Sequence, residues 1–117
     1  MQALIDLLNS LTIDNRSGAN LWAFDSFPTK SKTYTPPPPP FICLVMPGSN
    51  NMAADNKVHA RIEQIRLELY TEAKDPASEQ IIRNALDKAE IVYNTEETSL
   101  PDDRLYEVAF EFNMIIK

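Results

Sequence analysis

The sequence predicts an α+β domain whose mainly antiparallel sheet has about four strands and carries two helices on one face. Three observations lead to this fold class: a period of two through Arg104–Lys117, a second alternating stretch over Lys57–Tyr70, and helical periodicity over residues 2–12 and 76–90. We expect a single domain over residues 1–117, because a chain of this length can bury one core without disulfides or metals.

The closing segment carries the strongest pattern. Its odd positions include Glu107, Glu111 and Asn113, whereas every even position is apolar. This period of two predicts a long strand with one buried face. Burying side chains of this size stabilises the fold by about 1.5 to 3 kcal/mol each, so the apolar row is the expected spine of the core. The row consists of Tyr106, Val108, Phe110, Phe112, Met114 and Ile116.

Two helices are predicted from spacing and capping. Leu4, Leu7, Leu8 and Leu11 recur at i, i+3, i+4 and i+7, which indicates a short amphipathic helix over residues 2–12. In the second helix, Asp75 is the expected N-cap, a proline follows at the first helical position, and the helix runs to about residue 90. Its apolar face comprises Ile81, Ile82, Ala85, Leu86 and Ala89.

The remaining strands are assigned from shorter patterns. The apolar run Phe41–Met46 predicts a strand buried on both faces near the sheet centre, and Ile91–Glu96 predicts another strand. Asn20–Phe27 is left open between a short strand and an ordered extended segment. In Lys57–Tyr70 the apolar phase changes midway, which indicates a β-bulge near Glu63–Gln64 or a strand that changes the side it buries.

Three loops are predicted. Asp14–Gly18 is a cluster of turn formers, and residues 47–57 form a polar loop. The Pro-rich loop 28–40 is expected to be extended, because consecutive prolines donate no backbone hydrogen bonds. At about 3.1 Å per residue, its five prolines would span about 15 Å. They either lead Phe41 into its strand as a stiff spacer or act as a recognition peptide. The five prolines are Pro36, Pro37, Pro38, Pro39 and Pro40.

Composition excludes several classes of protein. The net charge of −6 argues against nucleic acid or an anionic membrane surface as the main partner. The one cysteine, Cys43, lies in an apolar run and is expected in the core, so no disulfide framework is possible within the chain. No apolar run approaches the ~20 residues of a membrane span, and the first residues lack a signal-peptide pattern. We therefore expect a cytoplasmic protein.

No catalytic or cofactor site is expected. With one histidine, His59, and one cysteine, the chain cannot assemble the usual zinc site or catalytic triad. Glu107 and Glu111 would lie about 13 Å apart along a strand, too far to act as a paired acid and base. The two glycines, Gly18 and Gly48, cannot form a phosphate-binding loop. The sequence thus predicts a protein that is not an enzyme and acts through its surfaces.

Four segments carry a family resemblance: Pro40–Val45, Asn50–Val58, Leu67–Pro76 with Glu79, and Leu105–Phe112. They resemble the tail completion, or tail-to-head joining, proteins of long-tailed bacteriophages, which are close in fold to tail terminators. The resemblance covers roughly residues 20–117, and the five-proline run departs from the family pattern.

This resemblance implies an α+β fold with a sheet flanked by helices. It also implies that the protein caps the tail tube at its head-proximal end and forms the interface to the head connector. The expected partners are further copies of the chain, the tail tube protein and the head connector or neck protein. The copies are expected to form a ring, which we expect to be hexameric. No specific nucleic acid and no membrane are expected as partners. The implied location is the host bacterial cytoplasm during assembly and the tail or neck of the finished virion.

The resemblance also implies interface residues. Asn50, Asn51, Asp55 and Asn56 would lie in a loop available to the ring lumen or to a neighbouring subunit, although they can equally be polar hairpin residues. Two alternative functions remain open. One is a head-side neck or connector component, and the other is a non-phage interaction module that presents its Pro-rich segment to a partner.

Overall fold

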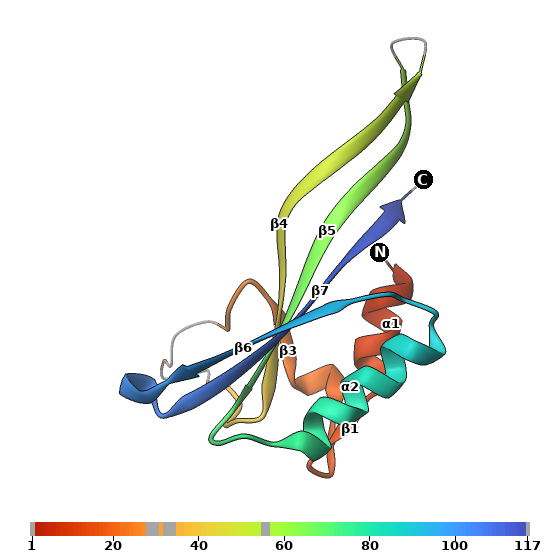
Figure 1. Cartoon of the computed structure of the whole chain (residues 1–117). Coiled ribbons are helices and arrows are strands. Elements are labelled where there is room, and N and C mark those ends of the chain that lie inside the picture. Colours follow the sequence, from red (N-terminus) through yellow and green to blue (C-terminus); the bar gives the residue numbers. More distant parts are fainter. Residues whose placement is uncertain (1, 28–30, 32–34, 55–56, 117) are drawn as a thin grey trace.

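The computed structural model describes residues 2–27, 31, 35–54 and 57–116, and over residues 49–61 and at residue 116 the description covers the backbone. Figure 1 shows the arrangement of the elements. In chain order they are α1 (Gln2–Ser10), β1 (Thr12–Ile13), β2 (Arg16–Ser17), the 3-10 helix η1 (Gly18–Asn20), β3 (Trp22–Phe24), β4 (Phe41–Ala54), β5 (Lys57–Thr71), α2 (Pro76–Lys88), β6 (Asn94–Leu100), the 3-10 helix η2 (Pro101–Asp103) and β7 (Leu105–Ile116).

The predicted α+β class is confirmed, but the main sheet is larger and mixed. It has five strands in the order β3-β4-β5-β7-β6, and β3 pairs parallel to β4 while the other pairs are antiparallel. The additional strand, β3, lies in the segment that the sequence left open. Residues 25–40 separate β3 from β4, and a parallel pair requires a long connection of this kind. A separate two-stranded sheet joins β1 to β2.

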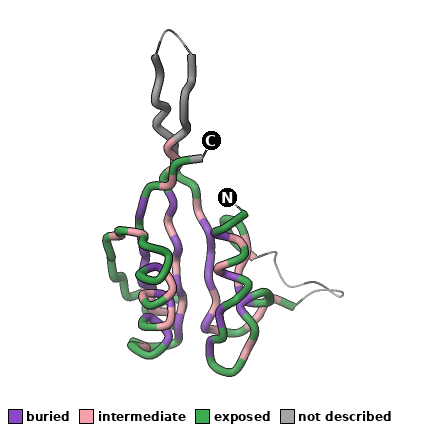
Figure 2. The backbone as a smooth tube through the Cα atoms, turned by 90° about the vertical axis from the view of Figure 1, so that its right-hand side faces the viewer, coloured by how far each residue is buried: buried purple, intermediate pink, exposed green. Residues whose placement is uncertain are grey.

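Both helices cover the same face of the sheet, as predicted. Leu8 of α1 and Ile82 of α2 belong to one buried cluster together with Phe110 of β7. Trp22 of β3 also ties the first helix to the sheet, because its indole N–H donates to Asn9 Oδ1 at 2.8 Å. Figure 2 shows buried positions along the strands and on the sides of the helices that face them. Among the described residues, no helix combines the length and apolar character needed to cross a membrane.

The opposite face of the sheet is more buried than the sequence predicted. Val108, Phe110 and Phe112 of β7 lie in the helix-covered core, but Ala109 and Glu107 on the other side are 0% and 8% exposed. Cys43 of β4 lies on this second face and is buried, which confirms its expected interior position. We call this side the helix-free face. The prediction of one buried face on the closing strand was therefore incomplete.

The predicted bulge at Glu63–Gln64 is wrong. The β5–β7 register runs without a shift from the Arg61 rung to the Thr71 rung. Two shifts occur instead between β4 and β5. At the first, Met46 and Pro47 of β4 lie opposite Ile65 alone, and the second lies between Met52 and Ala53 of β4. Proline suits such an irregular position on a strand because it has no N–H to pair. The side chains of residues 57–61 lie outside the description, so the alternative of a strand that changes the side it buries stays a prediction.

Three predicted loop and strand boundaries also change. The polar loop predicted over residues 47–57 is mostly strand, because residues 47–54 continue β4 and residue 57 begins β5. The strand predicted over residues 91–96 begins only at Asn94 and continues to Leu100. In the loop predicted over residues 14–18, Asp14 and Asn15 have positive φ and form the turn between β1 and β2, a conformation that Asp and Asn tolerate.

The two glycines provide a test of how closely α1 and its following turn pack. A Cβ on Gly18 would lie 2.1 Å from the carbonyl oxygen of Leu8, whereas a Cβ on Gly48 would meet only the end of the Gln64 side chain at 3.4 Å. We expect Gly18→Ala to lower the free energy of unfolding by about 1 to 3 kcal/mol, because backbone must move. Urea unfolding measures this loss. Gly48→Ala is the matched control, and equal losses in both variants would contradict the packing described for Gly18.

Candidate functional site

A two-stranded hairpin projects from the body of the protein (Figure 1). β7 accompanies β5 only as far as the Arg61–Ile116 rung. Beyond that rung, residues 52–54 of β4 and residues 57–60 of β5 pair only with each other among the described strands. We call these two stretches the hairpin arm. Because an isolated two-stranded hairpin is at best marginally stable in water, the arm gains stability when a partner packs against it.

The predicted asparagines lie at the base of the hairpin arm and not in a loop. Asn50 pairs with Ile62 and Asn51 with Arg61, so both belong to β4 at the level where β7 ends. The prediction of a loop at these positions is wrong, because the hairpin continues three residues further along β4. Asp55 and Asn56 lie outside the described residues.

The proline run, Pro36–Pro40, packs against the body instead of standing free. Arg16 of β2 holds it, donating from Nη1 to the Pro38 carbonyl and from Nη2 to the Pro40 carbonyl, both at 3.0 Å. Pro40 is buried, Pro36, Pro37 and Pro39 are half-buried, and Pro38 is exposed. The chain bends at Pro39–Pro40, so the run is not the uniform extended spacer that the sequence predicted.

Aromatic contacts begin where the proline run enters the sheet. Phe41 begins β4 directly after Pro40, and its ring stacks on Tyr70 of β5 with centroids 5.2 Å apart. Phe27 meets the same Phe41 ring edge-on at 5.4 Å. These contacts hold Phe41 at the start of β4, and the choice between a spacer and a recognition peptide stays a prediction.

The two predicted interface regions lie far apart. The proline run precedes β4, whereas Asn50 and Asn51 lie near the far end of the same strand. At about 3.3 Å per residue, the stretch from residue 41 to residue 50 spans about 30 Å. The structure therefore does not bring them into one site, and a single partner would have to be large to contact both.

The helix-free face carries a charged cluster that the sequence analysis did not predict. Arg66 of β5 lies at its centre, and its Nε and Nη2 each donate over 2.8 Å, to Glu68 and Glu107 respectively. Nη1 pairs with Glu96 of β6 at 3.3 Å and with Glu111 of β7. We call these five residues the Arg66 cluster. It joins three adjacent strands through one guanidinium.

The surroundings keep Arg66 charged and leave a negative excess. Burial opposes the charge on the guanidinium, but its hydrogen bonds to Glu68, Glu107 and Glu96 outweigh this effect, so the pKa of Arg66 is raised above its ordinary value. Four carboxylates share this one cation. The Arg66 cluster is therefore an ion-paired patch that remains acidic overall.

Neighbouring groups on this face are held in their neutral forms. Burial raises the pKa of the Cys43 thiol to about 11, and the charges of Glu68, Glu107 and Asp25 add to the shift. Burial and the same two glutamates also raise the pKa of Tyr70. A thiol with this pKa has little nucleophilic thiolate near neutral pH. Among the described residues, no group of His, Cys, Asp and Glu is arranged to hold a metal ion.

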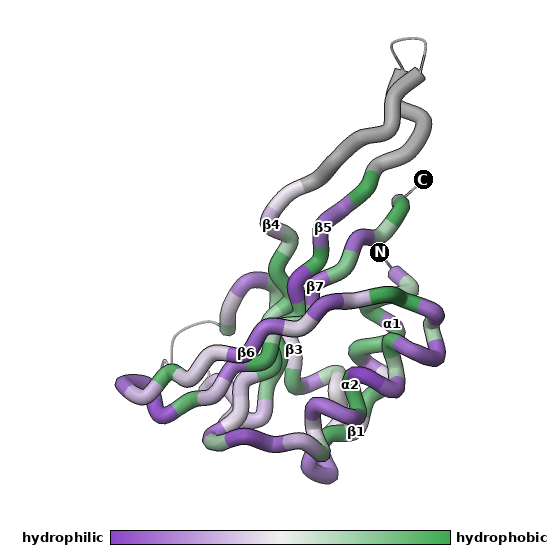
Figure 3. The backbone as a smooth tube through the Cα atoms, viewed as in Figure 1, coloured by the Kyte–Doolittle hydropathy of each residue, from purple (hydrophilic) through white to green (hydrophobic). Residues whose placement is uncertain are grey.

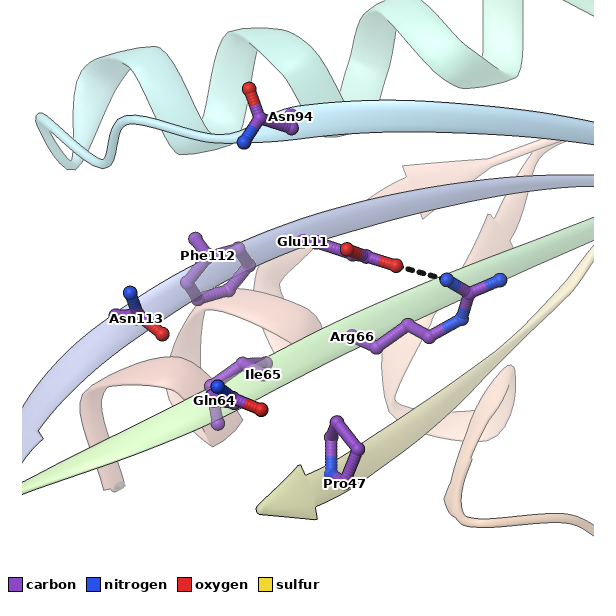
Figure 4. A pocket seen from close by; sticks show the side chains of 8 residues that line it. All are labelled: Pro47, Gln64, Ile65, Arg66, Asn94, Glu111, Phe112 and Asn113. Atoms are coloured by element: carbon purple, nitrogen blue, oxygen red, sulfur yellow. Dashed lines mark hydrogen bonds and ion pairs between the residues drawn. The ribbon is translucent and has the colours of Figure 1, made fainter. Parts of the chain in front are cut away.

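A crevice of about 370 Å³ opens beside the Arg66 cluster, between β5 and the start of β6 (Figure 4). The Arg66 guanidinium points toward Glu111 across it, and the side chains of Gln64, Asn94 and Asn113 add amide groups. The rest of the lining is apolar and consists of Pro47, Ile65 and Phe112. Such a lining offers hydrogen-bond donors and acceptors to a partner's backbone or side chains. It contains no nucleophile paired with a base.

The Arg66 cluster had a partial signal in the sequence. Gln64, Arg66 and Glu68 alternate with the core residues of β5, just as Glu107 and Glu111 alternate with those of β7. The pattern places them off the core face. Their meeting depends on the strand register, since Arg66 lies directly opposite Glu111 across the β5–β7 pair. Arg16 had no comparable signal, because its partners are backbone carbonyls of a distant segment.

No protein-family model matches the chain, and no curated protein matches it.

Removal of the central cation should destabilise the fold. Arg66→Ala leaves the Glu68 and Glu107 side chains, 16% and 11% exposed, without their cation. We expect the free energy of unfolding to fall by about 1 to 3 kcal/mol, below the cost of breaking a fully buried pair because solvent screens this site. Chemical denaturation measures the change. Lys88→Ala, at an exposed position of α2, should change it by less than about 0.5 kcal/mol.

A double-mutant cycle tests whether the cluster acts as a unit. If Arg66 and Glu107 are coupled, Arg66→Ala combined with Glu107→Ala should cost clearly less than the two single changes added together. Strict additivity of the three unfolding free energies would contradict the cluster as described.

Cys43 should report on unfolding through its reactivity. With a pKa of about 11, roughly one thiol in a thousand is ionised near pH 8, and the side chain is also buried. We expect a thiol-specific disulfide reagent to react with the native protein at the rate of unfolding, and with the urea-unfolded chain at the rate of a free thiol. Comparable reaction rates in the native and unfolded protein would show that the helix-free face is open to solvent at Cys43.

Proposed function

We propose that this chain is a non-enzymatic phage assembly protein that caps the tail tube at its head-proximal end and forms the interface to the head connector, as one subunit of a ring. The observation that carries the proposal is the hairpin arm, which extends past the last rung of the three-stranded part of the sheet. The sequence resemblance to tail completion proteins supplies the phage context.

The arm supports an assembly role through symmetry. An element that projects from one subunit and packs on a different surface of the next makes a head-to-tail contact, and such contacts generate rings when the rotation closes. The molecule measures 50 × 32 × 27 Å, so it is elongated enough to reach a neighbour.

The contacts of the proline run weigh against the interaction-module alternative. A proline-rich ligand presents its prolines and carbonyls to the groove of a partner. Here Arg16 already occupies two of these carbonyls, and Pro40 is buried. A head-side connector would also form a ring through the arm, so an experiment must distinguish that role from the tail-end role.

Shortening the arm tests the proposal directly. Residues 52–60 are replaced by Asn-Gly, which closes a two-residue turn on the Asn51–Arg61 rung and leaves the body pairing intact. We expect thermal melting close to that of the wild type, because the core lies outside the arm. In a phage whose copy of this gene is inactivated, we expect the shortened protein to leave the infectious titre at the level of the inactivated phage.

The particles that accumulate distinguish the alternatives. Tails of irregular length that lack heads support the tail-end role, whereas tails of normal length beside heads that lose their DNA indicate the head-side role. Asp87→Ala, at an exposed position of α2, is the control and should complement fully. If the shortened protein complements as well as this control, the arm is not needed for assembly and the proposed function is wrong.

A further inference from the structure

The ends of β6 and β7 diverge and leave part of β7 without a neighbour. β6 first pairs with β7 at the Asn94–Glu111 rung, whereas β7 continues to Ile116 and stays paired with β5 on its other side. The residues that precede β6, 91–93, have no regular structure. Among the described strands, none pairs with the outer edge of β7 from Phe112 onward. The free N–H and C=O groups of such an edge are those that an added strand binds.

A crevice of about 530 Å³ lies along this edge, between residues 90–94 and residues 111–115. We call it the edge crevice. Two large apolar side chains are exposed at it, Val92 at 91% and Ile115 at 61%. Figure 3 shows hydrophobic positions at the end of β7 and just before β6. Exposed apolar side chains that converge on an unpaired strand edge are typical of a contact surface.

The charge around the edge crevice selects the kind of partner. Glu90 and Glu111 lie on its rim, and the residues that line it include no basic side chain. It adjoins the Arg66 cluster, where four carboxylates share one guanidinium. A second copy of this chain, itself at −6, would bring like charge to the same place. Like charges on adjacent strands repel, whereas lysine or arginine there would be attracted.

We propose that the outer edge of β7 from Phe112 to Ile115 is a docking site for an extended basic segment of another protein. The segment adds as a strand where β6 leaves the edge open. Its apolar residues lie beside Phe112 and Met114 on the helix-covered face, and the lysines or arginines that alternate with them lie beside Glu111 on the helix-free face. The partner is therefore a short alternating stretch of basic and apolar residues. This inference does not depend on the proposed function, because it uses neither the hairpin arm nor the family resemblance.

A model peptide tests the site on the full chain. The probe is a fluorophore-labelled octapeptide of alternating lysine and valine with blocked ends, and fluorescence anisotropy at low salt measures its affinity. We expect Val92→Ser and Glu90→Lys each to weaken binding by about five-fold, through lost apolar contact and reversed charge respectively. Glu72→Lys is the matched control, since Glu72 is exposed and follows β5 at the opposite end of the β5–β7 pair. It should change the affinity by less than about two-fold.

Two further peptides separate strand addition from simple charge attraction. A lysine–valine peptide methylated on alternate amide nitrogens keeps its side chains but cannot pair along the edge, and a glutamate–valine peptide keeps the pairing but reverses the charge. We expect neither to bind measurably. Amide chemical shifts should change at residues 91–94 and 111–115 when the lysine–valine peptide binds.

Several outcomes would overturn the proposal. They are equal binding of the methylated peptide, no binding of the lysine–valine peptide, or shift changes confined to other parts of the sheet. Sedimentation of the chain alone provides the last check. A concentration-dependent dimer that Val92→Ser abolishes would mean that a second copy occupies the edge crevice, and the basic partner would then be wrong.

Discussion

The β5–β7 pairing determines most of what the rest of the molecule does. Its register runs without a shift from the Arg61 rung to the Thr71 rung, and each rung assigns one side chain of each strand to a face. On the helix-covered face it joins Leu67 to Phe110 in the core, and on the other it sets Arg66 opposite Glu111. A slip of one residue would exchange the two sets and bury the charges under the helices.

The two helices pack on one face of this sheet. Ile82 and Leu86 of α2 pack into the same cluster as Leu4 and Leu8 of α1, so both helices depend on the apolar face that the pairing creates. An ion pair adds to this packing at the start of α2. Lys74 contacts Glu79 of the helix and Glu97 of β6, which links the helix to the edge strand. Lys74 and Glu97 are 45% and 43% exposed, so solvent screens the contact between them, whereas the Glu79 side chain is buried.

The strands end at different levels at one end of the sheet. There β4 and β5 extend beyond β7, and β7 extends beyond β6. A globular domain usually shortens or covers such edges, because they recruit other strands. This staggered end presents both the hairpin arm and the edge crevice. The opposite end is closed by the proline run, which Arg16 holds against the body.

The sequence by itself determined the fold class, both helices, the long closing strand and the interior position of Cys43. These follow from local periodicity and capping, since apolar positions at the right spacing and an N-cap such as Asp75 act within a few residues of the chain.

Only the tertiary structure decided the parallel β3, the continuation of β4 through Asn50 and Asn51, and the position of the register shift at Pro47. The Arg66 cluster and the Arg16 contacts belong to the same group. Each depends on which segments lie beside one another, and hydrogen bonds between residues more than 20 positions apart leave no periodic trace in the chain. Local pattern specifies what each segment can bury, whereas strand pairing specifies which polar groups meet.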